Sequence, residues 1–174
     1  MRDAQVLSKM KLFTSLRDEK TVIFKKENIT YILTILIIFL FDRYSKIQVI
    51  DKLERTYYLN DYLNFDLVWN NGIGFGLLSQ SSTSLYNLIS AVIGVVIIFL
   101  IYNVFFKKIR EKLIFSIIIG GAIGNFYDRM IFKAVPDFIY LHYEDFHWFT
   151  FNIADIFITL GIAMYIILGK AEKK

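Results

Sequence analysis

Long apolar runs separated by polar segments dominate the pattern of this chain. A bilayer core about 30 Å thick takes roughly 20 residues of helix to cross. The runs that approach this length are residues 29–48, 83–106, 113–132 and 151–169. No charged residue lies between Asp66 and Lys107, so the second run is the clearest membrane helix. The pattern predicts an all-α polytopic membrane protein with four transmembrane helices.

Each of the other three runs carries an aspartate near one end, namely Asp42, Asp128 and Asp155. Charge in contact with hydrocarbon is costly, so these helix ends should reach the membrane interface or a water-filled cleft. Lys46 follows Asp42 by four residues, the spacing of an ordinary helical ion pair.

Lysine and arginine are unevenly distributed among the connections. Residues 1–28, 107–112 and 170–174 carry 14 of them, against six in 43–82 and 129–150. Positive charge accumulates in cytoplasmic loops, so both termini are predicted to be cytoplasmic and the three acidic helix ends extracytoplasmic.

Residues 1–28 form a basic arm, 29–169 the membrane domain, and 170–174 a short cytoplasmic tail. The spacing of apolar residues in the arm fits a helix lying on the inner leaflet. A disordered basic extension that only enforces the topology accounts for the arm equally well. No small-residue cleavage site follows the first apolar run, so we expect that run to be retained as a helix.

The outer connections have their own patterns. Residues 62–70 alternate, with Leu63, Phe65, Leu67 and Trp69 on one face, which is the period of a half-buried strand. A turn at 70–72 follows, and an apolar stretch resumes at residue 73. A small extracytoplasmic β-sheet, or β-cradle, is therefore predicted at about 52–80. The second connection, 137–150, is rich in the aromatic rings favoured at headgroup depth.

Composition supports a membrane protein. Hydrophobic residues make up 56% of the 174, and 17% are aromatic. Few soluble domains of this size could bury so much apolar surface. The absence of cysteine excludes disulfides, thiolate metal sites and cysteine nucleophiles. His142 and His147 are five residues apart, which does not place them on one helical face, so no metal site is expected.

Small residues mark the third run. Gly120, Gly121 and Gly124 have a spacing that allows close helix packing. An amide, an acid and a guanidinium follow directly at Asn125, Asp128 and Arg129. Packing explains the glycines but not the polar group that comes after them.

Asp128, Asp137 and Asp155 are predicted to lie close together around the ends of two apolar runs, on the same membrane face. Two close carboxylates share one proton readily, because repulsion and low dielectric oppose a double charge. A carboxylate that activates water and an acid that protonates a carbonyl oxygen suffice for amide hydrolysis. Asn125 and Asn152 can orient these acids, and Arg129 can hold a carbonyl or a lipid oxygen. The residues therefore indicate a membrane-embedded hydrolase.

Each acid also has an ordinary structural explanation. Asp128 can pair with Arg129 as an interfacial anchor, and Asp155 can be a helix N-terminal acid favoured by the helix dipole. Asp137 follows Pro136 and can belong to a turn. All of these acids converge on one membrane face, which favours a shared function.

The motifs resemble those of the lipoprotein signal peptidases (signal peptidase II) in order and spacing. They are Asp42-Arg-x-x-Lys46, Asn70-x-Gly72-x-x-Phe75-Gly76, Gly120-Gly-Ala-x-Gly-Asn-x-x-Asp-Arg129, Val135-x-Asp137-Phe138 and Phe151-Asn-x-Ala-Asp155. The resemblance covers residues 29–169. It implies an aspartic endopeptidase of the bacterial inner membrane that removes the signal peptide from diacylglyceryl-modified prolipoproteins, cleaving before the lipidated cysteine. The implied catalytic pair is Asp137 and Asp155.

The resemblance implies supporting or substrate-contacting roles for nine further residues: Asp42, Lys46, Asn70, Gly72, Asn125, Asp128, Arg129, Asn152 and Ala154. It implies a monomer in contact with membrane lipid, no cofactor, no nucleic-acid partner, and inhibition by cyclic lipopeptides such as globomycin. Gly74, Pro136 and Thr150 depart from the residues usual in the family, which affects loop rigidity and cleft shape without removing a functional side chain.

Other functional classes fit parts of this pattern. Intramembrane carboxylates also mark proton-coupled transporters, which is the main alternative. The halves of the chain show no internal repeat, however, and no run is broken at its centre. A non-catalytic scaffold would not require paired acids. A serine peptidase is disfavoured because no Gly-x-Ser-x-Gly motif is present and the histidines are expected in a loop.

Overall fold

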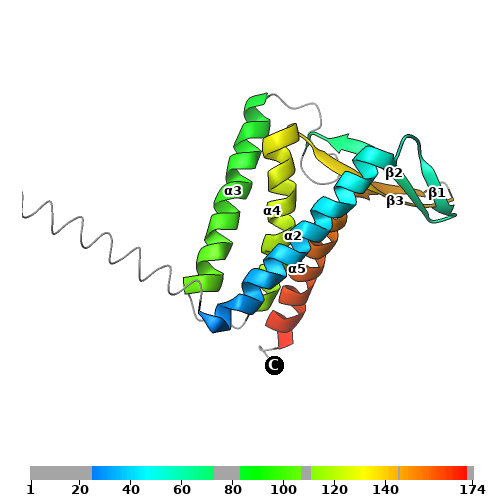
Figure 1. Ribbon diagram of the computed structural model, residues 1–174. Helices are drawn as coiled ribbons and strands as arrows, with labels where there is room; N and C mark the ends of the chain where they lie inside the picture. The colour runs from blue at the N-terminus through cyan, green and yellow to red at the C-terminus, as the bar shows by residue number, and fades with distance from the viewer. Residues whose placement is uncertain (1–24, 73–82, 107–110, 145, 172–174) are drawn as a thin grey trace, which may run out of the picture.

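A computed structural model describes residues 25–72, 83–106, 111–144 and 146–171. This part of the chain forms four helices and four strands (Figure 1). The helices are α2 (Lys26–Lys52), α3 (Thr83–Phe106), α4 (Lys112–Phe132) and α5 (Ile153–Ala171). The strands are β1 (Tyr57–Asn60), β2 (Leu63–Asn70), β3 (Val135–Tyr143) and β4 (Phe146–Phe151). The basic arm falls almost entirely outside the described residues, as does the apolar stretch that starts at residue 73.

The helices lie close to the predicted apolar runs, and α2 is the one that differs most, continuing through Lys52. In the described part of the chain, one helix is both long and apolar enough to cross a membrane, over the 23 residues Ser84–Phe106. In α5 the apolar segment is shorter, Ile153–Leu168. Buried charged residues interrupt the apolar character of α2 and α4.

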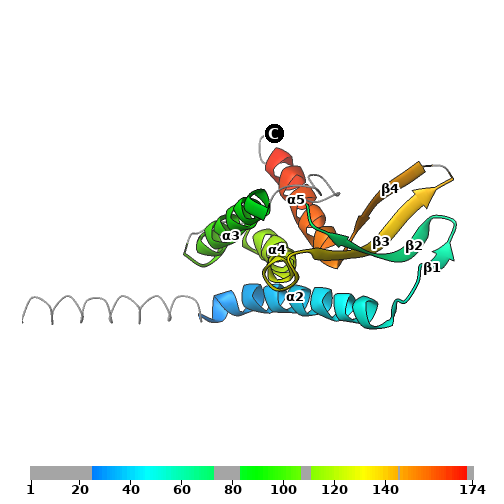
Figure 2. The same ribbon diagram turned by 90° about the horizontal axis from the view of Figure 1, so that it is seen from above.

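Helix α4 lies among the other three helices, as the view from above shows (Figure 2). Its glycines allow α2 and α5 to approach closely, as their spacing predicted. A Cβ atom on Gly120 would lie 2.8 Å from Cβ of Ile38 in α2, and one on Gly121 would lie 2.6 Å from the carbonyl oxygen of Ala154 in α5. A Cβ atom on Gly124 would meet the carboxylate of Asp42. Backbone contact of this kind requires glycine.

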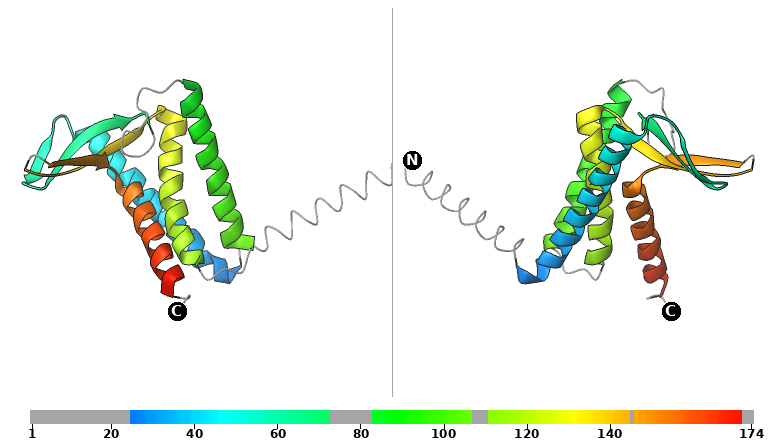
Figure 3. Two further views of the ribbon diagram at one scale, coloured as in Figure 1. Left: turned by 180° about the vertical axis from the view of Figure 1, so that it is seen from behind. Right: turned by 45° about the vertical axis from the view of Figure 1, so that its right-hand side comes forward.

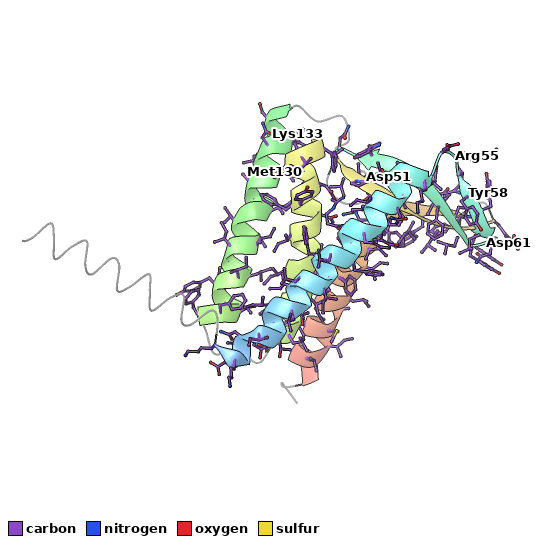
Figure 4. All side chains as sticks on the ribbon, in the orientation of Figure 1. Asp51, Arg55, Tyr58, Asp61, Met130 and Lys133 are labelled. Carbon is purple, nitrogen blue, oxygen red and sulfur yellow. The ribbon has the colours of Figure 1, made fainter. Side chains whose placement is uncertain are left out.

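The bundle is apolar at one end and polar at the other. Val104, Phe105 and Ile119 form a buried apolar cluster where the start of α2 meets the end of α3. At the opposite end, the sheet extends sideways from the helices (Figure 3). Lys133 at the end of α4, Asp51 near the end of α2 and Asp61 on the sheet also lie there (Figure 4).

All four strands form one antiparallel sheet in the order β1-β2-β3-β4. The predicted sheet at about 52–80 is therefore only half of the observed one. Strands β3 and β4 come from the second connection, which the sequence had marked only as an aromatic stretch. His142 and His147 are paired across these two strands, so the expectation that they lie in a loop is wrong.

The apolar face predicted for β2 is not its buried face. Asn64 and Asn70 are buried, whereas Trp69 is 42% exposed and contacts Phe132 at the end of α4. A register shift between Phe65 and Val68 breaks the simple alternation. The bulge leaves the amide of Asn70 in the interior.

Alanine at Gly121 or Gly124 should destabilise the bundle by about 1–3 kcal/mol, the usual cost of overpacking a tight contact. Gly94→Ala is the matched control, because its new Cβ would meet only the Phe126 ring, at 3.3 Å. Thermal unfolding in detergent measures the stability of the three variants. Equal stability of all three would contradict the close packing of α4.

Candidate active site

A buried ionic cluster joins α2 to α4. The Nζ atom of Lys46 donates hydrogen bonds to Oδ2 of Asp42 at 2.8 Å and to Oδ2 of Asp128 at 2.7 Å. Arg43 pairs with the other oxygen of Asp128. The side chains of Asp42, Lys46 and Asp128 have no exposed surface. The i,i+4 pair predicted for Asp42 and Lys46 is thus confirmed, as part of a larger cluster.

Asp42 also links α2 to α5. Its Oδ1 atom accepts a hydrogen bond from the backbone N–H of Ala154 at 2.9 Å. Ala154 is fully buried, and its carbonyl oxygen faces Gly121. The carboxylate of Asp42 therefore satisfies a free N–H in the first turn of α5.

Asp137 lies near the start of β3, with both oxygens hydrogen-bonded. The Nδ2 atom of Asn152 donates to Oδ1 at 2.6 Å, and Nδ2 of Asn70 donates to Oδ2 at 2.8 Å. The side chain is buried. Pro136 precedes it where β3 is paired only with β2, because pairing with β4 begins at Ile139. A missing N–H is tolerated at such an edge position.

Asp155 stands in the first turn of α5. Its Oδ1 atom accepts a hydrogen bond from Nδ2 of Asn125 at 2.8 Å, and its Oδ2 atom accepts one from the backbone N–H of Asn152 at 3.1 Å. In return, the N–H of Asp155 donates to Oδ1 of Asn152 at 3.1 Å. This reciprocal pair is a capping box, so the helix N-terminal interpretation of Asp155 is correct. The side chain of the same Asn152 also contacts Asp137, so the cap brings both acids to one residue.

The turn after β2 holds Arg129. Oδ1 of Asn70 accepts the N–H of Gly72 at 2.9 Å, and the carbonyl of Gly72 accepts Nη2 of Arg129 at 2.5 Å. The alternative in which Asp128 pairs with Arg129 as an anchor is wrong, because Asp128 faces α2 and pairs with Lys46 and Arg43.

Among the described residues, no carboxylate accepts a hydrogen bond from the guanidinium of Arg129. It lies 5.5 Å from the ring centroid of Tyr86, whose hydroxyl donates to the Arg129 carbonyl at 3.2 Å. Its Nε and Nη1 atoms are buried and have no hydrogen-bond partner in the part of the chain that the structure describes. The charge of Arg129 is therefore available to balance nearby carboxylates.

Two features of the site were missed by the sequence interpretation. One is Arg43, whose charge at the end of an apolar run was a usable signal. The other is a groove of about 590 Å³ beside Asp155. Its lining includes Leu141, Trp148, Phe151 and Ile158. Among the described residues that line it, Asp155 is the only charged one.

Burial raises the pKa of Asp137 from its ordinary value of 3.8 to about 7, and the negative charge of Asp155 acts in the same direction. The amides of Asn70 and Asn152 favour the ionised form and oppose this rise only partly. At neutral pH, Asp137 is therefore close to the midpoint of its titration.

This pKa makes folding stability depend on pH. The favourable contribution of Asp137 is fully present below the unfolded pKa of 3.8 and is lost as the pH rises through about 7. The loss is roughly 4 kcal/mol, since each unit of pKa shift corresponds to about 1.4 kcal/mol. The folding stability of Asp137→Asn, measured by unfolding in detergent, should therefore depend less on pH between 4 and 7 than that of the wild type. A pH dependence equal to that of the wild type would show that Asp137 titrates normally.

Comparison with known proteins addresses the family. A sequence model described as signal peptidase (SPase) II matches residues 34–169. A lipoprotein signal peptidase of Pelagibacter ubique (strain HTCC1062) is 44% identical over 138 residues, which are 77% of this chain and 83% of the relative. One from Dichelobacter nodosus (strain VCS1703A) is 37% identical over 132 residues, 74% of this chain and 86% of the relative. One from Francisella tularensis subsp. novicida (strain U112) is 38% identical over 153 residues, 83% of this chain and 92% of the relative.

Solved structures show a similar fold. A bacterial membrane enzyme determined by the in meso method at 2.3 Å resolution has a TM-score of 0.70 and 28% identity, covering 83% of this chain and 90% of the other. A second such enzyme, at 1.9 Å resolution, has a TM-score of 0.66 and 29% identity, covering 80% and 91%. The match over most of the chain, together with relatives at up to 44% identity, establishes that this protein belongs to the signal peptidase II family.

Proposed function

We propose that Asp137 and Asp155 are the catalytic dyad of this lipoprotein signal peptidase, which makes it an aspartic endopeptidase. The observation that carries this proposal is the position of Asn152, which contacts both acids. Its side chain donates to Asp137 while its backbone N–H donates to Asp155. One residue thereby holds the two carboxyl groups in a single arrangement.

The balance of buried charge supports a shared proton. In the described part of the site, three cations face four carboxyl groups: Arg43, Lys46 and Arg129 against Asp42, Asp128, Asp137 and Asp155. Uncompensated charge in a buried site is costly, so the neutral state has one protonated carboxyl group. Asp42 and Asp128 are engaged by Lys46 and Arg43, which leaves the proton to the dyad.

A singly protonated dyad can hydrolyse an amide. The ionised carboxylate takes a proton from water while the water oxygen attacks the carbonyl carbon. The protonated partner donates its proton to the carbonyl oxygen, forming a neutral tetrahedral intermediate. Collapse of the intermediate breaks the C–N bond, returns the hydroxyl proton to the acid, and delivers the other proton to the leaving amine.

The substrate is a lipoprotein precursor, and we propose cleavage before its diacylglyceryl-modified cysteine. The groove beside Asp155 fits an apolar segment, because the residues that line it, other than Asp155 itself, are mostly aromatic and aliphatic. The relatives are named as peptidases, and nothing in their names supports the transporter alternative. The remaining nine predicted residues support the dyad or the bound substrate in this proposal.

The enzyme is a bacterial membrane protein, and its topology is part of the proposal. We place four helices across the membrane within a domain at 29–169, with the arm at 1–28 and the tail at 170–174 in the cytoplasm. The uneven distribution of lysine and arginine supports this orientation. Exposed aromatic residues such as Tyr58 and Trp148 on the sheet are suited to headgroup depth at the extracytoplasmic face. The protein acts as a monomer in this arrangement.

Replacement of either dyad residue should stop cleavage. Asp137→Asn and Asp155→Asn retain size and most hydrogen bonding but remove the shared proton and the charge, so each should lower kcat by at least about 100-fold, the lower end of acid–base contributions. The double variant should be no worse than either single one, because the two groups act as a unit. Cleavage of a lipidated prolipoprotein measures activity, and binding of globomycin in at least one single variant is the control for folding. Near-native turnover of Asp137→Asn would reassign the dyad.

The orientation can be tested with single cysteines, since the native chain has none. Lys26→Cys lies at the start of α2, and Asn60→Cys lies at the end of β1; both positions are exposed. In intact cells, an impermeant thiol reagent should label residue 60 and spare residue 26. The reverse pattern would place the sheet and the dyad in the cytoplasm.

A further inference from the structure

We infer that Lys46 and Asn125 are positioning residues that make Asp155 the water-activating carboxylate and leave the proton on Asp137. This inference rests on the proposed dyad and specifies which of its two acids is ionised and which is protonated. The contacts behind it run from α2 through α4 to the first turn of α5.

The ammonium group of Lys46 fixes the orientation of Asn125. An ammonium group has three protons and no acceptor, and those of Lys46 are directed at Asp42, Asp128 and Oδ1 of Asn125, the last at 2.8 Å. A flipped Asn125 would place its NH₂ group against a buried ammonium. The amide oxygen must therefore face Lys46, and the NH₂ group must face Asp155.

Asp155 consequently meets donors on both oxygens. The Asn125 amide donates a hydrogen bond to Oδ1, and the backbone N–H of Asn152 donates one to Oδ2. Neither group can become an acceptor without breaking another contact. Nearby positive charge also favours the ionised form of Asp155. Lys46 polarises the Asn125 amide, Arg129 is a nearby cation, and α5 directs its positive N-terminal end at the carboxylate.

Asp137 also has a donor on each oxygen, but the negative charge of Asp155 opposes its ionisation. Its two donors are neutral amides, from Asn152 and Asn70, whose oxygens are each occupied by a backbone N–H. It is only 3% exposed, which favours its neutral form. Of the two acids, Asp155 is the one that lines the groove.

The surrounding charges agree with this assignment. Asp155 interacts electrostatically with Asp137 from β3, Lys46 from α2 and Arg129 from α4. The carboxylates of Asp42 and Asp128 lie on the other side of this group, hydrogen-bonded to Lys46. Since Asp42 and Asp128 are already paired within the ionic cluster, Arg129 is the cation that remains to balance the dyad. Water from the groove therefore gives its proton to Asp155, and the substrate carbonyl receives its proton from Asp137.

Asn125→Ala tests the relay without removing the charge pairs, because Lys46 keeps both of its carboxylate partners. The full-length enzyme in detergent is assayed for cleavage of a lipidated prolipoprotein from pH 4 to 9. We expect kcat to fall about 10- to 100-fold, the usual size of an effect exerted through an orienting partner, with KM little changed. The acid limb of the kcat profile should move up by about one pH unit, the lower end of a charge effect, and the alkaline limb should stay in place.

Two further variants complete the experiment. Asn125→Asp has the same shape but presents an oxygen to Asp155, so it should be at least as impaired as Asn125→Ala, and it tests the relay even if the alanine variant does not fold. Asn103→Ala on α3, which loses only a hydrogen bond to Phe99 of its own helix, is the matched control and should match the wild type. An unshifted acid limb in the Asn125 variants, or a shift of the alkaline limb instead, would overturn the relay. Such a result leaves the dyad intact, because the dyad is judged by the separate Asp137 and Asp155 variants.

Discussion

Lys46 is a lysine with no exposed surface inside a helical bundle, and much of the surrounding architecture satisfies its charge. Desolvation of an ammonium group costs several kcal/mol unless every proton finds a strong acceptor. Two carboxylates and an amide provide these acceptors, and they come from α2 and α4. The glycines of α4 bring the helices close enough for these contacts, since a Cβ atom on Gly124 would collide with the Asp42 carboxylate. The ionic cluster therefore requires the same close helix packing that it stabilises.

Three asparagines fix the positions of the two acids by hydrogen bonds. Asn70, Asn125 and Asn152 each have their oxygen engaged by an N–H donor or by Lys46, and each directs its NH₂ group at a carboxyl group. An amide held at both ends cannot turn, so the carboxyl groups are held as well. Rigid positioning before the substrate arrives is what acid–base catalysis requires. The flexible parts of the chemistry are then the water, the proton and the substrate.

The sequence predicted the helices better than the sheet. Hydropathy located α3 at 83–106 and α4 to within one residue, because a helix is a local structure. It could not show that β3 pairs with β2, because the paired residues of these two strands are more than 60 positions apart in the sequence. For Asp128 the sequence offered its neighbour Arg129 as one possible partner, whereas the observed partners are 82 and 85 residues away. The acids themselves were recognisable, since charged groups beside hydrocarbon stand out in any sequence.

The capping box of α5 has a consequence for how this protein loses activity. Asn152 lies between β4 and α5, caps α5 and contacts both acids, so the first helical turn and the proposed dyad are one structure. Helix termini open more easily than helix centres, on energies well below that of global unfolding. Fraying by a single turn would separate the two carboxyl groups while the rest of the bundle stayed helical. A local opening of this turn would therefore be enough to inactivate the enzyme, and a ligand that bridges the two acids would act as a clamp on the helix end.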